Sequence, residues 1–449
     1  MKHLLRPRAL VLFLGDLFFF VFAIWLSLFV RALELPTYEL FLSHLAPFSL
    51  LFFFWVAVFF VAGLYESRSI ILARRALSST LLIAQSINVV LAALFFFFVP
   101  LFGIAPKAVL GIYLVVSFLL VLLWRAVLFP WLGFQKSENA LVVGNSPEIE
   151  ELVVALNNAR GAPARICAVI DPSSAEILGA VNVAVSTFRP RFIIADFNDQ
   201  RVSSAFPGLY NFLLRGVRFF DAAALYEDVF GRVPLSFVDE RWLARNVSRS
   251  AHALYDPLKR LIDIFFGVLL GLISFLVYPF VALAIKLDDG GDIFITQERI
   301  GEGGRPFRIR KFRSMSGNDG GRYGESGTTK LVVTRVGKFL RTSRIDELPQ
   351  LWNVVRGSLS LIGPRPEVPS LVALYEKEIP FYPVRHLIKP GLSGSAQLYY
   401  HGDPHHAANV DSTKMKLSYD LFYLKHRSLT LDLSIGIKTI RRILMRSNA

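Results

Sequence analysis

The sequence is poor in cysteine and in charge. One cysteine, Cys167, stands among 449 residues, so the chain cannot form an internal disulfide and nothing in it requires an oxidising compartment. Charged residues make up 19%, below the roughly 25% that is usual for soluble globular proteins. These features exclude a disulfide scaffold, an intrinsically disordered chain and a collagen-like repeat.

Acidic residues are also scarce relative to basic ones. The chain has 35 Asp and Glu against 49 Lys and Arg, which gives a formal net charge of +14, while 53% of its residues are hydrophobic. At roughly 100–200 residues per domain, the length allows two to four domains. This composition is typical of an integral membrane protein with basic soluble parts.

Long apolar runs fill the N-terminal part of the chain, at residues 9–30, 46–65, 81–101 and 109–131. Each is close to the roughly 20 residues that a helix needs to cross a bilayer. Asp16 interrupts the first run, and a packing or interfacial role for it is favoured over a functional one. The sequence therefore predicts a four-helix transmembrane bundle in residues 1–135.

Basic residues beside these runs predict their orientation. They gather before the first run and between the second and third, whereas the other two connections contain only Arg31 and Lys107. Because Lys and Arg favour the cytoplasmic side, both the N-terminus and the segment after the fourth helix should face the cytoplasm. The first run is too long for a cleaved signal peptide and is interpreted as a retained anchor.

Residues 136–249 have an ordinary soluble composition in which short apolar strands alternate with amphipathic helical stretches. This alternation predicts a small Rossmann-like α/β domain with a parallel sheet. The first turn of this domain is Gly144-Asn145-Ser146-Pro147, which lacks the three-glycine fingerprint of dinucleotide-binding folds. A degenerate nucleotide fold with an assembly or regulatory role is therefore favoured over a dinucleotide site.

A fifth apolar segment, residues 261–285, contains Pro279. If it crossed the membrane, residues 286–449 would lie outside the cytoplasm, yet they carry 26 Lys and Arg against 16 Asp and Glu. Proline removes a backbone donor and bends a helix. The sequence therefore predicts a re-entrant helix that breaks at Pro279 and stays in one leaflet, followed by a basic domain that faces anionic headgroups.

The polar residues that suggest chemistry lie between residues 286 and 370. Residues 307–313 alternate apolar and basic side chains, which predicts a strand with cations on one face. Asp346 and Glu347 are adjacent, with Arg341 and Arg344 just upstream; such a pair suits acid–base or nucleophilic chemistry, although on most proteins it is merely a helix surface. Two prolines flank Arg365 and fix the backbone that presents its guanidinium.

Two further features were considered as binding sites. His401, His405 and His406 do not have a standard metal-ligand spacing, so a surface loop is favoured. The basic segment 438–446 is interpreted as an amphipathic helix on anionic lipid rather than a nucleic-acid site, and no nucleic-acid partner is expected.

Three motifs together resemble the signature of a known family: Lys311-Phe312-Arg313-Ser314-Met315, Asp346-Glu347-Leu348-Pro349-Gln350 and Gly363-Pro364-Arg365-Pro366. They look like those of the bacterial sugar transferases, the monotopic phosphoglycosyl transferases. The resemblance extends from about residue 258 to the C-terminus. Four preceding spans and a degenerate nucleotide fold are similar to the large subfamily, which includes undecaprenyl-phosphate galactose phosphotransferases.

The resemblance implies an activity. Such enzymes transfer a hexose-1-phosphate from a UDP-sugar to undecaprenyl phosphate and release UMP, the first membrane step of exopolysaccharide, capsule or O-antigen (lipopolysaccharide) synthesis. It also implies a monotopic α+β catalytic domain over residues 250–449, facing the cytoplasm of the bacterial inner membrane. A homodimer is expected by the same resemblance.

The resemblance also assigns roles to residues. The aspartate that matches Asp346 is the nucleophile and forms a phosphosugar–enzyme intermediate, Glu347 assists it, and both are expected to hold Mg²⁺, which neutralises the diphosphate. The cations assigned to substrate phosphates are Lys311, Arg313, Arg365 and, as a further candidate, Arg385.

Two other functions stay open at this point. One is a membrane-anchored, NAD-dependent nucleotide-sugar dehydratase or epimerase that would use the middle domain. The other is a non-catalytic scaffold for glycan assembly in which the motifs are inert.

Overall fold

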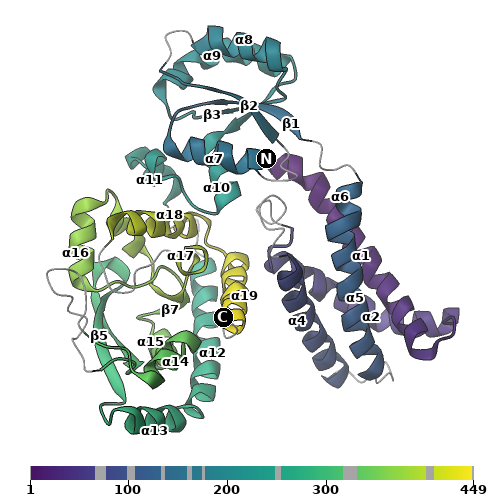
Figure 1. Cartoon of the computed structure of the whole chain (residues 1–449), viewed down its shortest axis with the longest axis vertical. Coiled ribbons are helices and arrows are strands. Elements are labelled where there is room, and N and C mark those ends of the chain that lie inside the picture. Colours follow the sequence, from purple (N-terminus) through teal and green to yellow (C-terminus); the bar gives the residue numbers. More distant parts are fainter. Residues whose placement is uncertain are drawn as a thin grey trace. The chain divides into compact units, whose positions relative to one another are not determined.

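A computed structural model describes residues 2–65, 77–98, 107–132, 137–158, 164–173, 177–247, 254–316, 331–400 and 409–446. The chain divides into two compact units, Met1–Phe237 and Val238–Ala449. Figure 1 shows the elements of each unit, and the units are described separately below. The histidines at 401, 405 and 406 lie outside the described residues, as does most of the glycine-rich stretch before residue 331.

Apolar helices begin the first unit: α1 (Lys2–Ala32), α2 (Tyr38–Val61), α4 (Leu77–Phe98) and α5 (Lys107–Leu123), followed by the π-helix η3 (Trp124–Leu128) and the short α6 (Phe129–Trp131). Within the described segments, three stretches are long and apolar enough to cross a membrane: Ala9–Ala32, Tyr38–Val61 and Val109–Leu128. The apolar part of α4, Thr80–Phe96, is shorter. Four helices thus form where the four runs were predicted, and three of them have the length and composition of a span.

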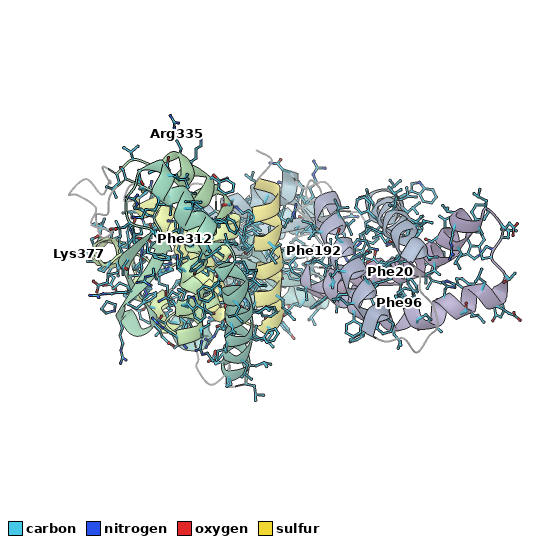
Figure 2. All side chains as sticks on the ribbon, turned by 90° about the horizontal axis from the view of Figure 1, so that it is seen from below. Phe20, Phe96, Phe192, Phe312, Arg335 and Lys377 are labelled. Atoms are coloured by element: carbon cyan, nitrogen blue, oxygen red, sulfur yellow. The ribbon has the colours of Figure 1, made fainter. Side chains whose placement is uncertain are left out.

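Aromatic residues fill the centre of these helices. Phe20, Phe48, Trp55 and Tyr113 are completely buried and stack or meet edge-on, and Figure 2 shows Phe20 among these helices. Such pairs add about 0.5–1.5 kcal/mol each beyond the burial of their surface. Aromatic packing therefore accounts for the phenylalanine-rich composition of this part.

An ion pair lies inside the same helices. Asp16 of α1 accepts a hydrogen bond of 3.0 Å from Nε of Arg125, and Tyr65 donates to its other oxygen at 2.6 Å. Arg125 also donates to the backbone oxygen of Leu64 at 2.8 Å. Asp16 is therefore a buried packing residue rather than an interfacial one. Its partner Arg125, inside the fourth apolar run, was not anticipated from the sequence.

The α/β part of the first unit contains β1 (Glu138–Val143), α7 (Pro147–Asn158), β2 (Ala164–Ile170), α8 (Ile177–Phe188), β3 (Phe192–Ala195), α9 (Gln200–Leu214), β4 (Arg218–Asp221), α10 (Ala222–Phe230) and the 3₁₀ turn η4 (Leu235–Phe237). The sheet is parallel with strand order β2-β1-β3-β4. Alternate residues of β1 enter two separate cores, one with α7 and α10 and one with α8 and α9. The predicted small α/β domain with a parallel sheet is thus present.

The turn after β1 leaves little of a nucleotide cradle. Gly144 has a φ of 158°, and a Cβ there would lie 2.1 Å from Ile149 Cδ1, so this glycine serves helix–strand packing. Asn145 donates to the Asp171 carboxylate at 3.0 Å. In dinucleotide-binding folds an acidic residue beyond the second strand binds the ribose, whereas Asp171 here is engaged by its own chain.

The second unit begins with α11 (Glu240–Asn246), α12 (Tyr255–Phe275) and α13 (Tyr278–Asp288). The last two are bent by 53° at a short break. Pro279 lies in the first turn of α13, where its missing N–H costs little, so the break falls just upstream of the proline. Gly267 lets α15 approach α12 closely, because a Cβ there would lie 3.2 Å from Val355.

Two small sheets and the remaining helices complete the second unit. The antiparallel pair is β5 (Phe294–Ile300) and β6 (Pro306–Phe312), joined through η6 (Glu302–Gly304); the parallel pair is β7 (Ser360–Ile362) and β8 (Gly391–Ser393). The helical elements are α14 (Arg335–Ser343), η7 (Ile345–Gln350), α15 (Leu351–Arg356), α16 (Pro369–Glu378), η8 (Tyr382–Leu387), α17 (Ser395–Tyr399), α18 (Val410–His426) and α19 (Leu429–Arg446). The mixture of elements is α+β.

Strand β6 confirms the predicted strand but corrects its faces. Arg308 and Arg310 lie on one face with Phe312, which stacks on Phe294 at 5.0 Å. Lys311 lies on the opposite face with Ile309. Successive side chains of a strand alternate, so the neighbours Arg310 and Lys311 cannot share a face as predicted.

Candidate active site

The Asp346–Glu347 pair lies in the 3₁₀ helix η7, immediately after a sharp reversal of the chain. Arg344 ends α14 in the left-handed conformation, with φ of 61° and ψ of 14°. This conformation is uncommon outside glycine and turns the chain inward. Asp346 and Glu347 are consequently only 8% and 7% exposed, which excludes the solvent-exposed helix surface that was the alternative interpretation.

Cations from three separate elements surround Glu347. Its Oε1 accepts hydrogen bonds of 3.2 Å from Arg344 and 3.2 Å from Arg365. Burial alone would raise the pKa of Glu347, but the charges of Arg365, Lys311 and Arg344 outweigh it and hold the pKa well below its usual range. Glu347 is therefore a permanent anion at neutral pH.

Asp346 has the opposite character. Burial and the adjacent Glu347 carboxylate raise its pKa, and Lys311 and Arg344 offset only part of this shift. Its Oδ1 is buried and accepts no hydrogen bond. Burial of a carboxylate oxygen without a hydrogen bond lowers the stability of the fold. Such an oxygen is also not occupied by a donor of the protein. The pair thus separates into a carboxylate that stays ionised and one whose pKa is raised and whose Oδ1 has no hydrogen-bond partner.

Lys311 and Arg365 meet at a small polar cavity beside Glu347. Arg299 of β5 and Gln350 of η7 also line it. Burial, together with Arg299 and Arg365, lowers the pKa of Lys311 to about 8. Three cations converging on one small cavity are suited to an anion with several oxygens, such as a diphosphate.

Arg365 is held rigidly by its backbone. The loop after β7 is tied to β8 by hydrogen bonds from the N–H of Gly363 to the oxygen of Ser393 and from the N–H of Gly391 to the oxygen of Pro364, both 2.8 Å long. A Cβ at Gly363 would lie 2.6 Å from the oxygen of Lys389. The glycine is therefore required for this close approach, which fixes the starting point of the Arg365 side chain.

Arg385 lies behind this loop rather than in the polar cavity. Its guanidinium is buried, lies 2.7 Å from the Asp420 carboxylate and donates to the hydroxyl of Tyr382 at 2.6 Å. It also donates to the backbone oxygen of Arg365 at 3.0 Å. The structure thus places Arg385 where it positions Arg365, with both of its terminal nitrogens directed at groups of the protein itself.

Arg313 is likewise directed elsewhere. It forms an ion pair with Asp289 at the end of α13 and packs directly over Gly291. The predicted cations are therefore divided: Lys311 and Arg365 lie at the carboxylates, whereas Arg313 and Arg385 make structural ion pairs. Arg299 and Gln350 were not singled out from the sequence, and the position of Arg299 opposite Phe307 in the β5–β6 register is the signal that would have found it.

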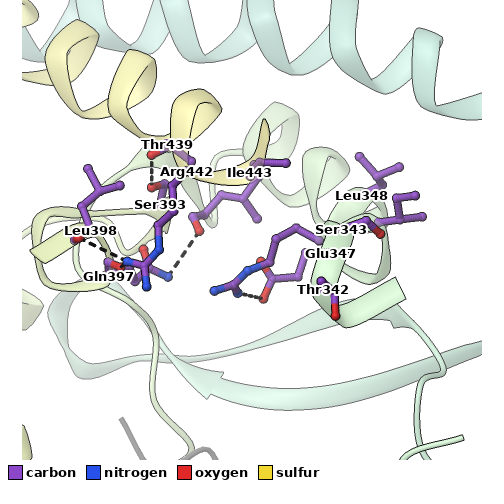
Figure 3. Close-up of a pocket in the computed structure, with 13 residues that line it drawn as sticks. Thr342, Ser343, Glu347, Leu348, Ser393, Gln397, Leu398, Thr439, Arg442 and Ile443 are labelled. Atoms are coloured by element: carbon purple, nitrogen blue, oxygen red, sulfur yellow. Dashed lines mark hydrogen bonds and ion pairs between the residues drawn. The ribbon is translucent and has the colours of Figure 1, made fainter. Parts of the chain in front are cut away.

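A second, larger cavity is also lined by Glu347 and is named here the α19 cavity. It has a volume of about 230 Å³, and its walls come from the end of α14, η7, β8, α17 and α19. Figure 3 shows Ser343, Glu347 and Leu348 opposite Leu398, Arg442 and Ile443. Arg442 donates to the backbone oxygen of Leu398 at 3.2 Å, which fixes α17 against α19.

The carboxylates fit a divalent cation of the magnesium type. Mg²⁺ prefers carboxylate oxygens and is usually held by one or two of them together with substrate phosphates. The unpaired Oδ1 of Asp346, beside the permanently ionised Glu347, meets this requirement. In the part of the chain that the structure describes, three or more metal-ligating side chains do not cluster anywhere, so a site completed by protein side chains alone is not found there.

Comparison with known proteins identifies the second unit. A family model described as bacterial sugar transferase matches residues 254–446. The chain is 40% identical over 257 residues to the UDP-N-acetylgalactosamine-undecaprenyl-phosphate N-acetylgalactosaminephosphotransferase of Aeromonas hydrophila, covering 56% of this chain and 58% of that protein.

Two further relatives are matched over most of their length. A UDP-glucose:undecaprenyl-phosphate glucose-1-phosphate transferase of Caulobacter vibrioides is 38% identical over 195 residues, which are 43% of this chain and 72% of the relative. An exopolysaccharide production protein of Rhizobium leguminosarum biovar phaseoli is 37% identical over 190 residues, 41% of this chain and 93% of the relative. With the buried carboxylate pair and its cations, these matches place the chain in a family: it is a member of the bacterial sugar transferases.

Proposed function

We propose that the chain transfers a hexose-1-phosphate from a UDP-sugar to undecaprenyl phosphate and releases UMP. The observation that carries this proposal is the buried Asp346, whose Oδ1 has no hydrogen-bond partner beside a cavity lined by Arg299, Lys311 and Arg365. The names of the Aeromonas and Caulobacter relatives, which act on UDP-sugars and undecaprenyl phosphate, support it.

The proposed reaction has two balanced steps. A carboxylate oxygen of Asp346 attacks the phosphorus that carries the sugar, the bond from this phosphorus to the bridging oxygen breaks, and UMP leaves with that oxygen. A phosphate oxygen of the lipid then attacks the same phosphorus, and the bond to Asp346 breaks. The product is a lipid diphosphosugar, and the carboxylate is regenerated. Covalent catalysis of this kind divides one difficult transfer into two easier ones.

The residues around Asp346 supply what phosphoryl transfer requires. Lys311, Arg365 and Arg299 stabilise the charge on the phosphate oxygens, and the rigid loop that holds Arg365 keeps this charge in place before the reaction. Glu347 accepts hydrogen bonds from Arg344 and Arg365 and holds both guanidinium groups in place, and its charge raises the pKa of the adjacent Asp346. When bound at the carboxylates, Mg²⁺ would add positive charge that neutralises the diphosphate.

The wider architecture forms part of the proposal. Residues 1–135 would be a four-helix transmembrane bundle, residues 136–249 a Rossmann-like domain, and residues 250–449 a monotopic catalytic domain whose bent pair α12–α13 enters and leaves one leaflet. Basic residues beside the apolar runs support a cytoplasmic catalytic domain at the inner membrane. The product would start the synthesis of an exopolysaccharide, capsule or O-antigen. The chain is also expected to form a homodimer, which light scattering in detergent tests.

Neither alternative function is favoured. A nucleotide-sugar dehydratase or epimerase would need a dinucleotide site, yet Asn145 and Ser173 already occupy the Asp171 carboxylate. An inert scaffold would not need a costly unpaired carboxylate oxygen beside a cationic cavity.

The experiment is an assay of UMP release by the purified full chain with undecaprenyl phosphate, Mg²⁺ and a panel of UDP-sugars, which also identifies the sugar. Asp346→Asn should abolish release. Asp411→Asn is the matched control, because the side chain of Asp411 is 95% exposed and lies 3.7 Å from the exposed Lys414; it should retain wild-type activity. Full activity of Asp346→Asn would overturn the nucleophile assignment.

A further inference from the structure

The α19 cavity is chemically different from the polar cavity that holds Lys311. The two cavities share Glu347 and Leu392 in their walls. The polar cavity has three cations, whereas five of the thirteen residues that line the α19 cavity are leucine or isoleucine, together with the two cations Arg344 and Arg442. A compound with a phosphate and an apolar chain would find a partner for each part across this boundary.

The size of the α19 cavity limits what can occupy it. A cavity of about 150 Å³ lined by aliphatic side chains admits benzene, so a cavity of about 230 Å³ admits a short branched chain of roughly one or two isoprene units. All of its lining residues are described, and none is aromatic. Nucleobases usually stack on aromatic side chains, so an aliphatic chain fits these walls better than a uracil ring.

The rim of the α19 cavity is apolar on the outside as well. Ile443 lines the cavity and is 37% exposed, and Ile440, one turn earlier on α19, is 57% exposed. Phe339 of α14, one turn before the lining residues Thr342 and Ser343, is 65% exposed. Exposed apolar side chains beside a cavity mouth are characteristic of a surface that meets lipid. A lipid chain could therefore enter without crossing water.

Charge at the inner end agrees with this orientation. Arg344 lies at the boundary, where it donates to Glu347 at 3.2 Å, and Arg442 lies on the opposite wall. A guanidinium group suits the recognition of a phosphate. An acceptor chain lying in the α19 cavity would therefore direct its phosphate towards Arg344, next to the Asp346–Glu347 pair.

We propose that the α19 cavity holds the isoprenoid units next to the phosphate of the lipid acceptor. The inference rests on the proposed function, since it assigns one substrate of that reaction to a separate subsite. Each buried methylene contributes about 0.8 kcal/mol, so the first prenyl units, rather than the distant tail, select the acceptor. In this proposal the diphosphate of the UDP-sugar is assigned to the cations that line the polar cavity, Arg299, Lys311 and Arg365.

The two half-reactions separate the acceptor from the donor. With a UDP-sugar and Mg²⁺ but no acceptor, the enzyme should release one burst of UMP; dimethylallyl, geranyl and farnesyl phosphate then report the second step. Leu398→Trp fills the α19 cavity and should raise the KM for farnesyl phosphate by about tenfold or more, with the burst still present. Leu433→Trp is the matched control, because Leu433 lies on α19, is 48% exposed and does not line the cavity; this variant should match the wild type in both steps.

Three results would overturn the inference. A burst reduced by Leu398→Trp with an unchanged acceptor KM would assign the cavity to the nucleotide or the sugar. Equal KM values in wild type and Leu398→Trp would show that the acceptor does not use it. A diazirine-bearing farnesyl phosphate, which tests the wild-type chain irrespective of how the variant folds, should label residues 392–398 or 439–443; labelling elsewhere counts against the subsite. Absence of any wild-type burst would instead contradict the proposed function.

Discussion

The buried pair of Arg385 and Asp420 allows stability and activity to be separated by mutation. Both side chains are 2% exposed and lie 2.7 Å apart. Asp420→Asn removes one charge and leaves Arg385 buried without its counter-ion, which should destabilise the second unit by about 3–5 kcal/mol. Replacing both, as Arg385→Met with Asp420→Leu, removes the uncompensated charge, so stability should return close to the wild type.

Activity should not return with stability in the double variant. In the wild-type chain, Arg385 donates a hydrogen bond of 3.0 Å to the backbone oxygen of Arg365. The double variant lacks this hydrogen bond. An unsatisfied buried carbonyl costs about 1–3 kcal/mol. If the loop shifts to avoid this cost, Arg365 moves away from Glu347, and kcat should fall by roughly 10- to 100-fold. Thermal unfolding in detergent measures the change in stability, and UMP release measures the change in kcat.

The contrast between the two variants is the critical result. A stable double variant with reduced kcat supports a positioning role for Arg385. A stable double variant with wild-type kcat would refute this reasoning, since the hydrogen bond to Arg365 would then be dispensable. An equally unstable double variant would show that the pair contributes net stability, contrary to the expectation for a buried ion pair.

Three further outcomes are expected. Arg365→Lys replaces a planar fork by a point charge and should lower kcat/KM by roughly 10-fold or more, whereas Arg356→Lys, on the neighbouring α15, serves as a control with little effect. The pH profile of kcat/KM should be bell-shaped. Activity falls towards acidic pH because Asp346 must be ionised and its pKa is raised, and it falls at alkaline pH because Lys311 must be protonated and its pKa is about 8. Lys311→Arg should remove the alkaline limb, and an alkaline limb that is unchanged in this variant would be assigned to another group. Asp16→Asn should destabilise the apolar helices by about 3–5 kcal/mol because it leaves Arg125 buried without its carboxylate, and Asp16→Leu with Arg125→Met should recover most of this loss in a detergent unfolding assay.

Local sequence alone was sufficient to predict several elements of the fold. The apolar runs, the strand at residues 306–312 and the alternation in the α/β part follow from the periodicity of their side chains. Asp346, Glu347 and Arg365 were identified because their motifs are short and contiguous. Their burial depends on the left-handed conformation of Arg344, which is not evident from residue type.

The remaining features depend on partners that are distant in the chain. Arg313 and Arg385 look like phosphate ligands in a linear sequence, but Asp289 and Asp420 neutralise them once the chain folds. Arg125 escaped notice because a single cation hardly changes the average hydropathy of a long run. Arg299 reaches the site only through the pairing of β5 with β6. Charge pairing across the fold therefore decides which cations are available to a substrate.

The covalent intermediate is the most direct test of the proposed mechanism. The purified chain would be incubated with a UDP-sugar and Mg²⁺ in the absence of a lipid acceptor, digested and examined by peptide mass spectrometry. A hexose-phosphate adduct on Asp346, which disappears when undecaprenyl phosphate is added, is the predicted result. Steady turnover to UMP and lipid diphosphosugar with Asp346 unmodified throughout, or with the adduct on another residue, would contradict it.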